Sequence, residues 1–167
     1  PYMEDLRTAT GAAVHLAILD GTEVVYLQVL SSKQAPRMNS RRGGRLPAHA
    51  TGVGKAILAF SPDETVQKVI DTGMPRLTAR TIATPGQLRR ELTTIRAAGV
   101  AYDREESNPG VLCAAAPIFA SDGRVRAALS VSGFSRRLAP RMGPAVQTSV
   151  LALTRDLARQ SWALPTN

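Results

Sequence analysis

Two stretches of the chain are rich in apolar residues, and each has an Asp-Gly pair near its middle. Such a pair between runs with a period of two is typical of a β-hairpin. The sequence therefore predicts two hairpins, residues 14–19 and 23–29 around Asp20-Gly21, and residues 111–119 and 124–132 around Asp122-Gly123.

The alternation also predicts which residues of the first hairpin are buried. If Asp20 and Gly21 form a two-residue turn, one apolar face results, and we expect it to be core. This face contains Val14, Leu16, Ile18, Val25 and Leu27. The following segment, residues 31–45, is polar and basic, which indicates a loop or an irregular edge.

Helical patterns fill most of the remaining chain. Residues 1–10 are expected to end a helix at Gly11, and the apolar run 56–60 predicts a helix that starts after Thr51. Capping-box spacings at Ser61 and Thr84 predict two more helices, to about Asp71 and to Gly99.

Residues 100–103 are expected to form a short strand, and residues 104–110 a polar loop. A last helix is expected over 140–161, because Val146, Val150, Leu153 and Leu157 recur at helical spacing. Hairpins separated by helices indicate an α+β fold with a mainly antiparallel sheet.

Composition narrows the class of protein. The chain has 167 residues, of which 44% are hydrophobic and 20% charged, as expected for a single packed domain. Its one cysteine excludes an intrachain disulfide and fits a reducing compartment. There is no signal peptide and no apolar run long enough for a membrane span, so we expect a cytoplasmic protein.

The net charge of +8 leaves two interpretations open. A basic surface can bind nucleic acid, or it can be solvated or face an acidic patch on a neighbour. The second is favoured because the sequence has no helix-turn-helix or zinc-finger motif and few aromatic residues. The clustered arginines are Arg37, Arg41, Arg42, Arg45, Arg136, Arg137 and Arg141.

The stretch Leu46-Pro-Ala-His-Ala-Thr-Gly-Val-Gly-Lys55 is the first candidate site. Gly52, Val53 and Gly54 are expected in the first turn of a helix, where backbone N–H groups have no partner within the helix. Glycine lets a ligand approach those groups closely. The pattern therefore predicts a site for a small anion such as a carboxylate or phosphate.

The second hairpin supplies another candidate. With Asp122-Gly123 as its turn, Ala115 pairs with Ser130 and Cys113 with Ser132, so one face carries small side chains, two hydroxyls and a thiol. Either this face is the floor of a pocket or it packs beneath a helix; the spacing favours neither. The opposite face is apolar core, made of Leu112, Ala114, Ala116, Ile118, Val125, Ala127, Leu129 and Val131.

Other polar residues give weaker signals. His49 is expected to make a local hydrogen bond or packing contact, and spacing does not bring Cys113 near His15 or His49 as a nucleophile would require. The glycine stretch lacks the first glycine and the hydroxyl residue of a P-loop, and no metal or cofactor motif is present. Acidic residues near Asp103 are expected to lie in a solvated loop unless Asp103 faces the pocket.

Three segments resemble a known family, the effector-binding domain of IclR-type bacterial transcription regulators. They are Pro47-Ala-His-Ala-Thr-Gly-Val-Gly-Lys-Ala56, the stretch from Gly99 to Phe119 that includes Tyr-Asp-Arg-Glu-Glu-Ser-Asn-Pro-Gly, and Ala127-Ala-Leu-Ser-Val-Ser-Gly133. They occur in the family's order, and the resemblance covers essentially the whole chain.

The resemblance implies a GAF-like or profilin-like domain, with an antiparallel sheet of about six strands and helices around it. It also implies a pocket for a small organic acid. The acid's carboxylate would meet the N–H groups of Gly52 and Val53. The other implied pocket residues are Asp103, Cys113, Ser130 and Ser132, with Met38 as an apolar wall.

The resemblance further implies how such a domain acts. Residues 1–10 would be the remnant of an interdomain linker helix and 11–167 the effector-binding domain. The family's N-terminal winged helix-turn-helix, absent from this chain, would bind operator DNA. The domains associate as dimers or tetramers, and the effector would shift the population of conformers that bind the operator. The alternatives are an oligomerisation domain with a vestigial pocket and a small cysteine-dependent enzyme using Cys113 and Asp103.

Overall fold

A six-stranded antiparallel sheet forms the centre of the computed structural model, which describes residues 1–32, 40–134 and 139–160. The strand order is β3-β2-β1-β6-β5-β4, so the two predicted hairpins meet at the pair β1 and β6. The strands are β1 (Ala13–Asp20), β2 (Glu23–Leu30), β3 (Arg45–Pro47), β4 (Ala101–Arg104), β5 (Leu112–Phe119) and β6 (Val125–Gly133).

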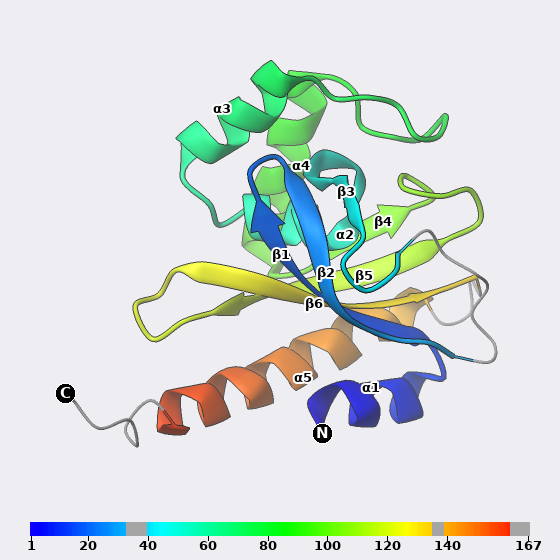
Figure 1. The fold of residues 1–167 in the computed structure, drawn as a ribbon, viewed down its shortest axis with the longest axis vertical. Helices are drawn as coiled ribbons and strands as arrows, with labels where there is room; N and C mark the ends of the chain where they lie inside the picture. The colour runs from blue at the N-terminus through cyan, green and yellow to red at the C-terminus, as the bar shows by residue number, and fades with distance from the viewer. Residues whose placement is uncertain (33–39, 135–138, 161–167) are drawn as a thin grey trace.

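Helices cover both faces of this sheet (Figure 1). Helices α1 and α5 lie against one face, and α2, α3 and α4 lie on the other side. Their bounds are α1 (Tyr2–Thr10), the 3-10 turn η1 (Ala48–Ala50), α2 (Gly52–Leu58), α3 (Asp63–Thr72), α4 (Pro85–Ala98) and α5 (Ala139–Gln160). The α+β class expected from the sequence is confirmed.

Two apolar cores result, one on each face. Leu129 and Val131 of β6 pack with Met142 and Val146 of α5 on the first face. On the second face, Ala115 and Ala128 pack with Ala56 of α2. A sheet buried on both sides explains why its strands read as nearly continuous apolar runs toward their middles.

Most predicted helix ends are confirmed. Gly11 and Gly99 end α1 and α4 in the left-handed conformation, with φ of 64° and 70°. The Thr84 side chain caps α4 by accepting a hydrogen bond from Gln87 N at 3.4 Å. The predicted cap at Ser61 is wrong: its hydroxyl donates to the Ile57 carbonyl at 2.8 Å, and α3 begins at Asp63 without a side-chain cap.

The first hairpin differs from its predicted register. Asp20 pairs with Glu23, so the turn is Gly21-Thr22, and a bulge follows between Leu16 and Ala17. As a result Leu27 is 43% exposed rather than core, although Val14 is fully buried as expected. Strand β3, which the polar segment before it did not predict, pairs with β2 and forms one edge of the sheet.

The second hairpin has the predicted register where it matters for a pocket. Ala115 pairs with Ser130, and Cys113 with Ser132. Its turn, however, is longer than predicted, because Ala120 N donates to the Arg124 carbonyl at 2.9 Å. A bulge between Ile118 and Phe119 compensates for the extra residues and restores the register beyond it.

Candidate ligand-binding site

Four strands bring polar side chains together on the face that α2 covers. Cross-strand partners point to the same face of a sheet, so the pairings define two adjacent rows. One row runs Asp103, Cys113, Ser132, Ala13, and the other runs Ala101, Ala115, Ser130, His15, each across β4, β5, β6 and β1.

Helix α2 begins directly above these rows. Thr51 caps it by accepting a hydrogen bond from Gly54 N at 3.0 Å, which fixes where the first turn starts. Gly52 lies so close to β5 that an added Cβ would be 3.0 Å from Cys113 Sγ. Within the described ranges, no acceptor is found for the N–H groups of Gly52 and Val53. The helix start thus presents free donors beside the thiol and hydroxyls of the sheet.

Between the helix start and the sheet lies a partly open cavity of about 30 Å³. That is room for about two water molecules, so an organic acid needs the cavity to expand. The residues predicted as ligand contacts and described by the structure all line it, whereas Met38 lies outside the described residues. The lining residues are His15, Tyr26, Ser40, Leu46, Thr51, Gly52, Val53, Asp103, Ser107, Asn108, Val111, Cys113, Ser130 and Ser132.

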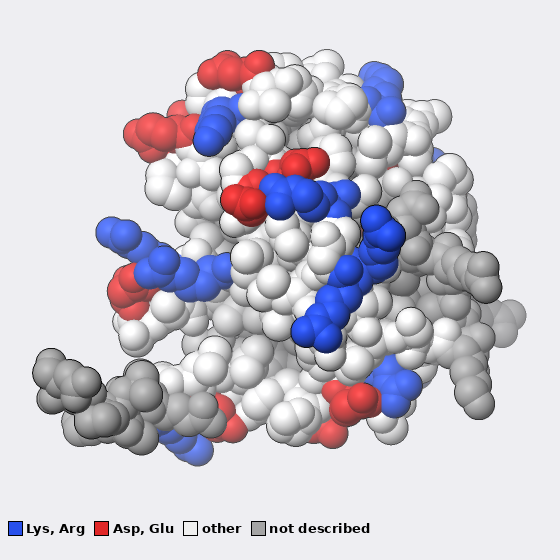
Figure 2. Space-filling view, viewed as in Figure 1, with Lys and Arg blue, Asp and Glu red and all other residues white. Residues whose placement is uncertain are grey.

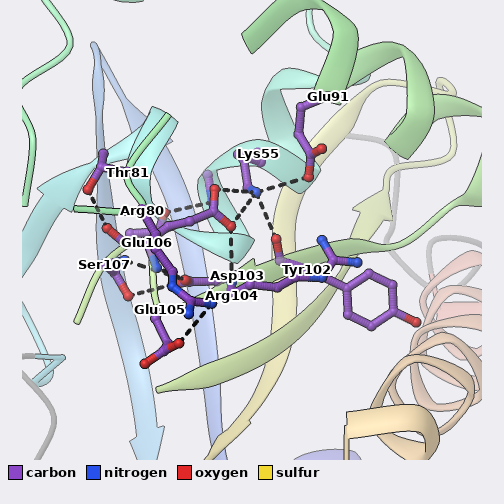
Figure 3. Close-up of polar contacts among 12 residues, drawn as sticks. Lys55, Arg80, Thr81, Glu91, Tyr102, Asp103, Arg104, Glu105, Glu106 and Ser107 are labelled. Carbon is purple, nitrogen blue, oxygen red and sulfur yellow. Dashed lines mark hydrogen bonds and ion pairs between the residues drawn. The ribbon is translucent and has the colours of Figure 1, made fainter. Parts of the chain in front are cut away.

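Asp103 is buried and holds the loop that follows β4 (Figure 3). Its carboxylate accepts hydrogen bonds from Glu106 N at 2.6 Å and from the Ser107 backbone and hydroxyl. Burial raises the pKa of Asp103 to about 6, although the hydrogen bonds from Ser107 and Glu106 N oppose that shift. The expectation of a solvated acidic loop is therefore wrong for this residue, which faces the cavity.

Cys113 is also buried at the cavity. Burial, and secondarily the nearby Asp103 carboxylate, raise the pKa of its thiol to about 12, while hydrogen bonding with Ser132 and Ser130 has the opposite effect. The thiol therefore stays protonated near pH 7. Because the thiolate is the nucleophile, this environment opposes cysteine-dependent catalysis.

His15 is one of the cavity residues that the sequence did not single out as a ligand contact. Its ring is 2% exposed, Nε2 lies 2.8 Å from Ser40 Oγ, and Tyr26 packs edge-on against it at 5.6 Å. In the described part of the chain, Nδ1 is buried without a hydrogen-bond partner. Burial lowers the pKa of His15 to about 4, so the ring is neutral near pH 7. Only the pairing of β1 with β6 places it beside Ser130.

The other histidine has a local role, as expected. His49 is buried in the 3-10 turn before α2, and its Nε2 lies 3.0 Å from the Pro75 carbonyl oxygen. It is not among the residues that line the cavity.

A buried lysine ties α2 to α4, to β4 and to the loop that follows β4 (Figure 3). Lys55 Nζ is fully buried and donates to both Glu106 oxygens at 2.8 and 2.9 Å, to Glu91 Oε1 at 3.1 Å and to the Tyr102 carbonyl at 2.7 Å. We call Lys55, Glu91 and Glu106 the lysine cluster. The sequence did not indicate this role for Lys55, because its partners Glu91 and Glu106 are remote in the chain.

The basic residues do not merge into one patch on the face that Figure 2 shows. Blue and red side chains touch at several places there, and only some blue side chains have no red neighbour. Arg45 pairs with Asp20 and Glu23, and Arg89 pairs with Asp63. Such pairing favours a solvated basic surface over a nucleic-acid interface.

Neither a metal site nor a membrane-spanning helix is found in the described ranges. No group of three or more histidine, cysteine, aspartate or glutamate residues there is arranged to hold a metal ion. No described helix is long and apolar enough to cross a membrane.

Comparison with known protein families gives a match over nearly the whole chain. The model for the bacterial transcriptional regulator IclR C-terminal domain matches residues 1–160. Among curated proteins, the chain is 39% identical over 141 residues to the transcriptional repressor AllR of Klebsiella pneumoniae, covering 84% of the chain and 52% of AllR. It is 34% identical to the regulator BhcR of Paracoccus denitrificans, covering 95% of the chain and 57% of BhcR.

Solved structures agree. An IclR homologue from Microbacterium hydrocarbonoxydans, complexed with 4-hydroxybenzoate, has a TM-score of 0.90 and 29% identity, covering 95% of the chain and 66% of the homologue. The Thermotoga maritima IclR has a TM-score of 0.86 and 32% identity, covering 93% of the chain and 65% of that protein.

The chain thus spans about half the length of the curated relatives it matches. Those relatives are transcriptional regulators rather than enzymes. With the family model matching residues 1–160 and the solved relatives sharing the fold, the chain belongs to the IclR family of bacterial transcriptional regulators and corresponds to their C-terminal domain.

Proposed function

We propose that this domain senses a small organic acid, which binds in the cavity between the start of α2 and the sheet. The observation that carries the proposal is the combination of free N–H groups at Gly52 and Val53 with buried polar side chains facing them. Backbone donors at a helix start suit a carboxylate. The side chains that complete the site are Asp103, Cys113, Ser130 and Ser132.

Protonation of Asp103 makes the site compatible with an anion. Its pKa is already raised to about 6 by burial, and a bound carboxylate nearby raises it further. In the complex Asp103 then carries a proton and donates a hydrogen bond to the ligand. The ligand's carboxylate therefore meets donors without an opposing charge.

The small volume of the cavity supports a mechanism by population shift. A ligand larger than the present space of about 30 Å³ binds only a conformer in which the helix start and the sheet stand further apart. The lysine cluster joins α2 to β4 and α4, so displacement of α2 is transmitted to those elements. In the full-length regulator this change would alter the arrangement of subunits in a dimer or tetramer, and with it the affinity for operator DNA.

The function as a whole is divided among segments of the full-length regulator. Operator binding would belong to an N-terminal winged helix-turn-helix, residues 1–10 would continue from the linker helix, and residues 11–167 would form the sensing unit. A regulator that acts on DNA works in the cytoplasm. The relative complexed with 4-hydroxybenzoate supports the sensing function, because it is an IclR homologue with an organic acid bound.

A calorimetric and thermal-shift screen tests the proposal. The probes are small mono- and dicarboxylates, 2-oxo acids and aromatic acids, with the wild-type chain, Ser130→Ala and Ser121→Ala. Ser130 is buried at the cavity, and Ser121 is an exposed serine of the same hairpin. We expect at least one acid to stabilise the wild type, with its affinity about fivefold lower in Ser130→Ala, since a hydrogen bond contributes about 1 kcal/mol.

The matched control should bind like the wild type. If no acid raises the unfolding temperature, or if Ser130→Ala binds as tightly as the wild type, the cavity is not the sensing site. The domain would then serve as an oligomerisation unit with a vestigial pocket.

A further inference from the structure

His15 has a hydrogen-bonding atom that the fold leaves unused. Its ring lines the cavity from β1 and is nearly fully buried, with Nε2 already engaged by Ser40. Nδ1 is buried too, yet no acceptor or donor within the described residues meets it. A buried polar atom without a partner is unfavourable, and such atoms in native proteins require an explanation. A bound ligand would supply the missing partner.

The place of His15 in the sheet separates it from the start of α2. An added Cβ at Gly52 would lie 3.6 Å from Ala115 Cβ, so the proposed carboxylate site lies above β5. His15 lies in the same row as Ala115 but two strands away, with Ser130 between them. Two strand spacings amount to roughly 10 Å between backbones. A ligand that reaches both ends therefore has a polar group remote from its carboxylate.

The chemistry of the ring selects that group. A neutral imidazole has one donor and one acceptor nitrogen, and which one Nδ1 is depends on whether Ser40 donates to Nε2 or accepts from it. A hydroxyl both donates and accepts, so it satisfies Nδ1 in either tautomer. A second carboxylate only accepts, so it satisfies Nδ1 in one tautomer alone, and it would add a second buried charge to the cavity.

We propose that His15 is a specificity-determining ligand residue, whose Nδ1 binds the hydroxyl of a hydroxycarboxylic acid at the end remote from the carboxylate. This inference rests on the proposed function, that the cavity binds an organic acid. It adds the chemical class of the ligand and a ligand contact on β1, neither of which the acid-sensing proposal contains.

Matched pairs of acids test this inference by calorimetry. Each pair differs by one hydroxyl: glycolate and acetate, 4-hydroxybutanoate and butanoate, 4-hydroxybenzoate and benzoate. For the wild-type chain we expect the hydroxylated member of at least one longer pair to bind about tenfold more tightly. We expect no such preference for glycolate over acetate, whose hydroxyl is too close to the carboxylate to reach His15.

Variants at the two buried histidines assign the preference to one ring. His15→Leu should lose it, with the hydroxy acid about tenfold weaker and the parent acid unchanged. His15→Asn, whose amide occupies about the position of Nδ1, should keep it in part. His49→Leu is the matched control, because His49 is equally buried but contacts Pro75 rather than the cavity. Thermal unfolding of each variant confirms that it is folded.

The outcomes separate the two proposals. If acids bind but hydroxylated and parent acids bind equally, or if His15→Leu keeps the preference, the role of His15 is overturned while acid sensing stands. If no acid binds at all, both proposals fail.

Discussion

Two groups of buried polar side chains lie near α2, the lysine cluster and the cavity residues, and they differ in how their hydrogen-bonding capacity is used. In the lysine cluster, Lys55 makes contacts to two carboxylates and a backbone carbonyl, so its charge is matched where it lies. At the cavity, burial shifts the pKa of Asp103, Cys113 and His15 toward their neutral forms, and His15 Nδ1 has no partner.

The difference separates structure from function. Removing charges from water is costly unless they are fully paired, and a fully paired cluster has nothing left to offer a ligand. Neutral groups with unused donors and acceptors cost some stability in the free protein but gain partners when a ligand arrives. The lysine cluster therefore holds the helix in place, and the cavity is where binding energy becomes available.

The largest effect is expected at the lysine cluster. Lys55→Ala leaves Glu106, which is 5% exposed, as a buried charge without its cation. Breaking such a pair costs about 3–5 kcal/mol of unfolding free energy, measurable by urea unfolding. The double variant Lys55→Met with Glu106→Gln should regain a large part of this loss, since the one carboxylate left without its cation, Glu91, is partly exposed to solvent. An equal loss in both variants would show that packing, not charge pairing, is what Lys55 contributes.

A smaller effect is expected for the reactivity of Cys113. Because its pKa is raised to about 12 by burial, only about one thiol in 10⁴ is ionised at pH 8. Alkylation by iodoacetamide should therefore be at least about 100-fold slower in the folded protein than in urea. The chain has one cysteine, so mass spectrometry reports this site alone. A folded rate within tenfold of the unfolded rate would contradict the environment described for the thiol.

The smallest effect is a pair of opposing pH dependences. The pKa of Asp103 is raised to about 6, so the folded state binds this proton more tightly than the unfolded chain does. The contribution of Asp103 to the free energy of unfolding therefore decreases as the pH is raised from about 4 to 6. The pKa of His15 is lowered to about 4, so the unfolded chain binds this proton more tightly than the folded state does. The contribution of His15 to the free energy of unfolding therefore increases as the pH is raised from about 4 to 6.5. In the wild type the two largely cancel.

Single variants should expose each dependence. The measurement is urea unfolding at each pH. As the pH is raised from 4 to 6, the free energy of unfolding of Asp103→Asn should increase by about 2 kcal/mol relative to that of the wild type, and that of His15→Asn should decrease by about as much. Parallel curves for all three proteins would mean that neither group is perturbed by burial. His49→Asn is the control, and it should follow the wild type more closely. Burial lowers the pKa of His49 too, but there the Pro75 hydrogen bond and the Glu106 charge oppose the shift, whereas burial is the one cause of the lowered His15 pKa.

The two hairpins show how far local sequence goes. In the second, the predicted turn was too short, yet the pairs Ala115–Ser130 and Cys113–Ser132 were predicted correctly. The bulge near Phe119 offset the longer turn. In the first, the turn was wrong and a bulge between Leu16 and Ala17 added to the shift, so Leu27 became exposed. Bulges depend on contacts between strands and sheet twist, which alternation does not encode.

Most elements, the α+β class and the glycine-rich helix start could be predicted from the chain alone, because capping residues, turns and apolar periodicity act over a few residues. The sequence also determined that Cys113, Ser130 and Ser132 share a face, since one hairpin carries all three. It took the folded structure to bring His15 to this face, because β1 pairs with β6, which lies far along the chain. The pairing of β4 with β5 brings Asp103 there, and from the sequence only the family resemblance implied that position. The partners of Lys55 were decided in the same way, 36 and 51 residues away. Charge pairing and burial depend on distance in space, and the packing of the sheet against α2 sets that distance.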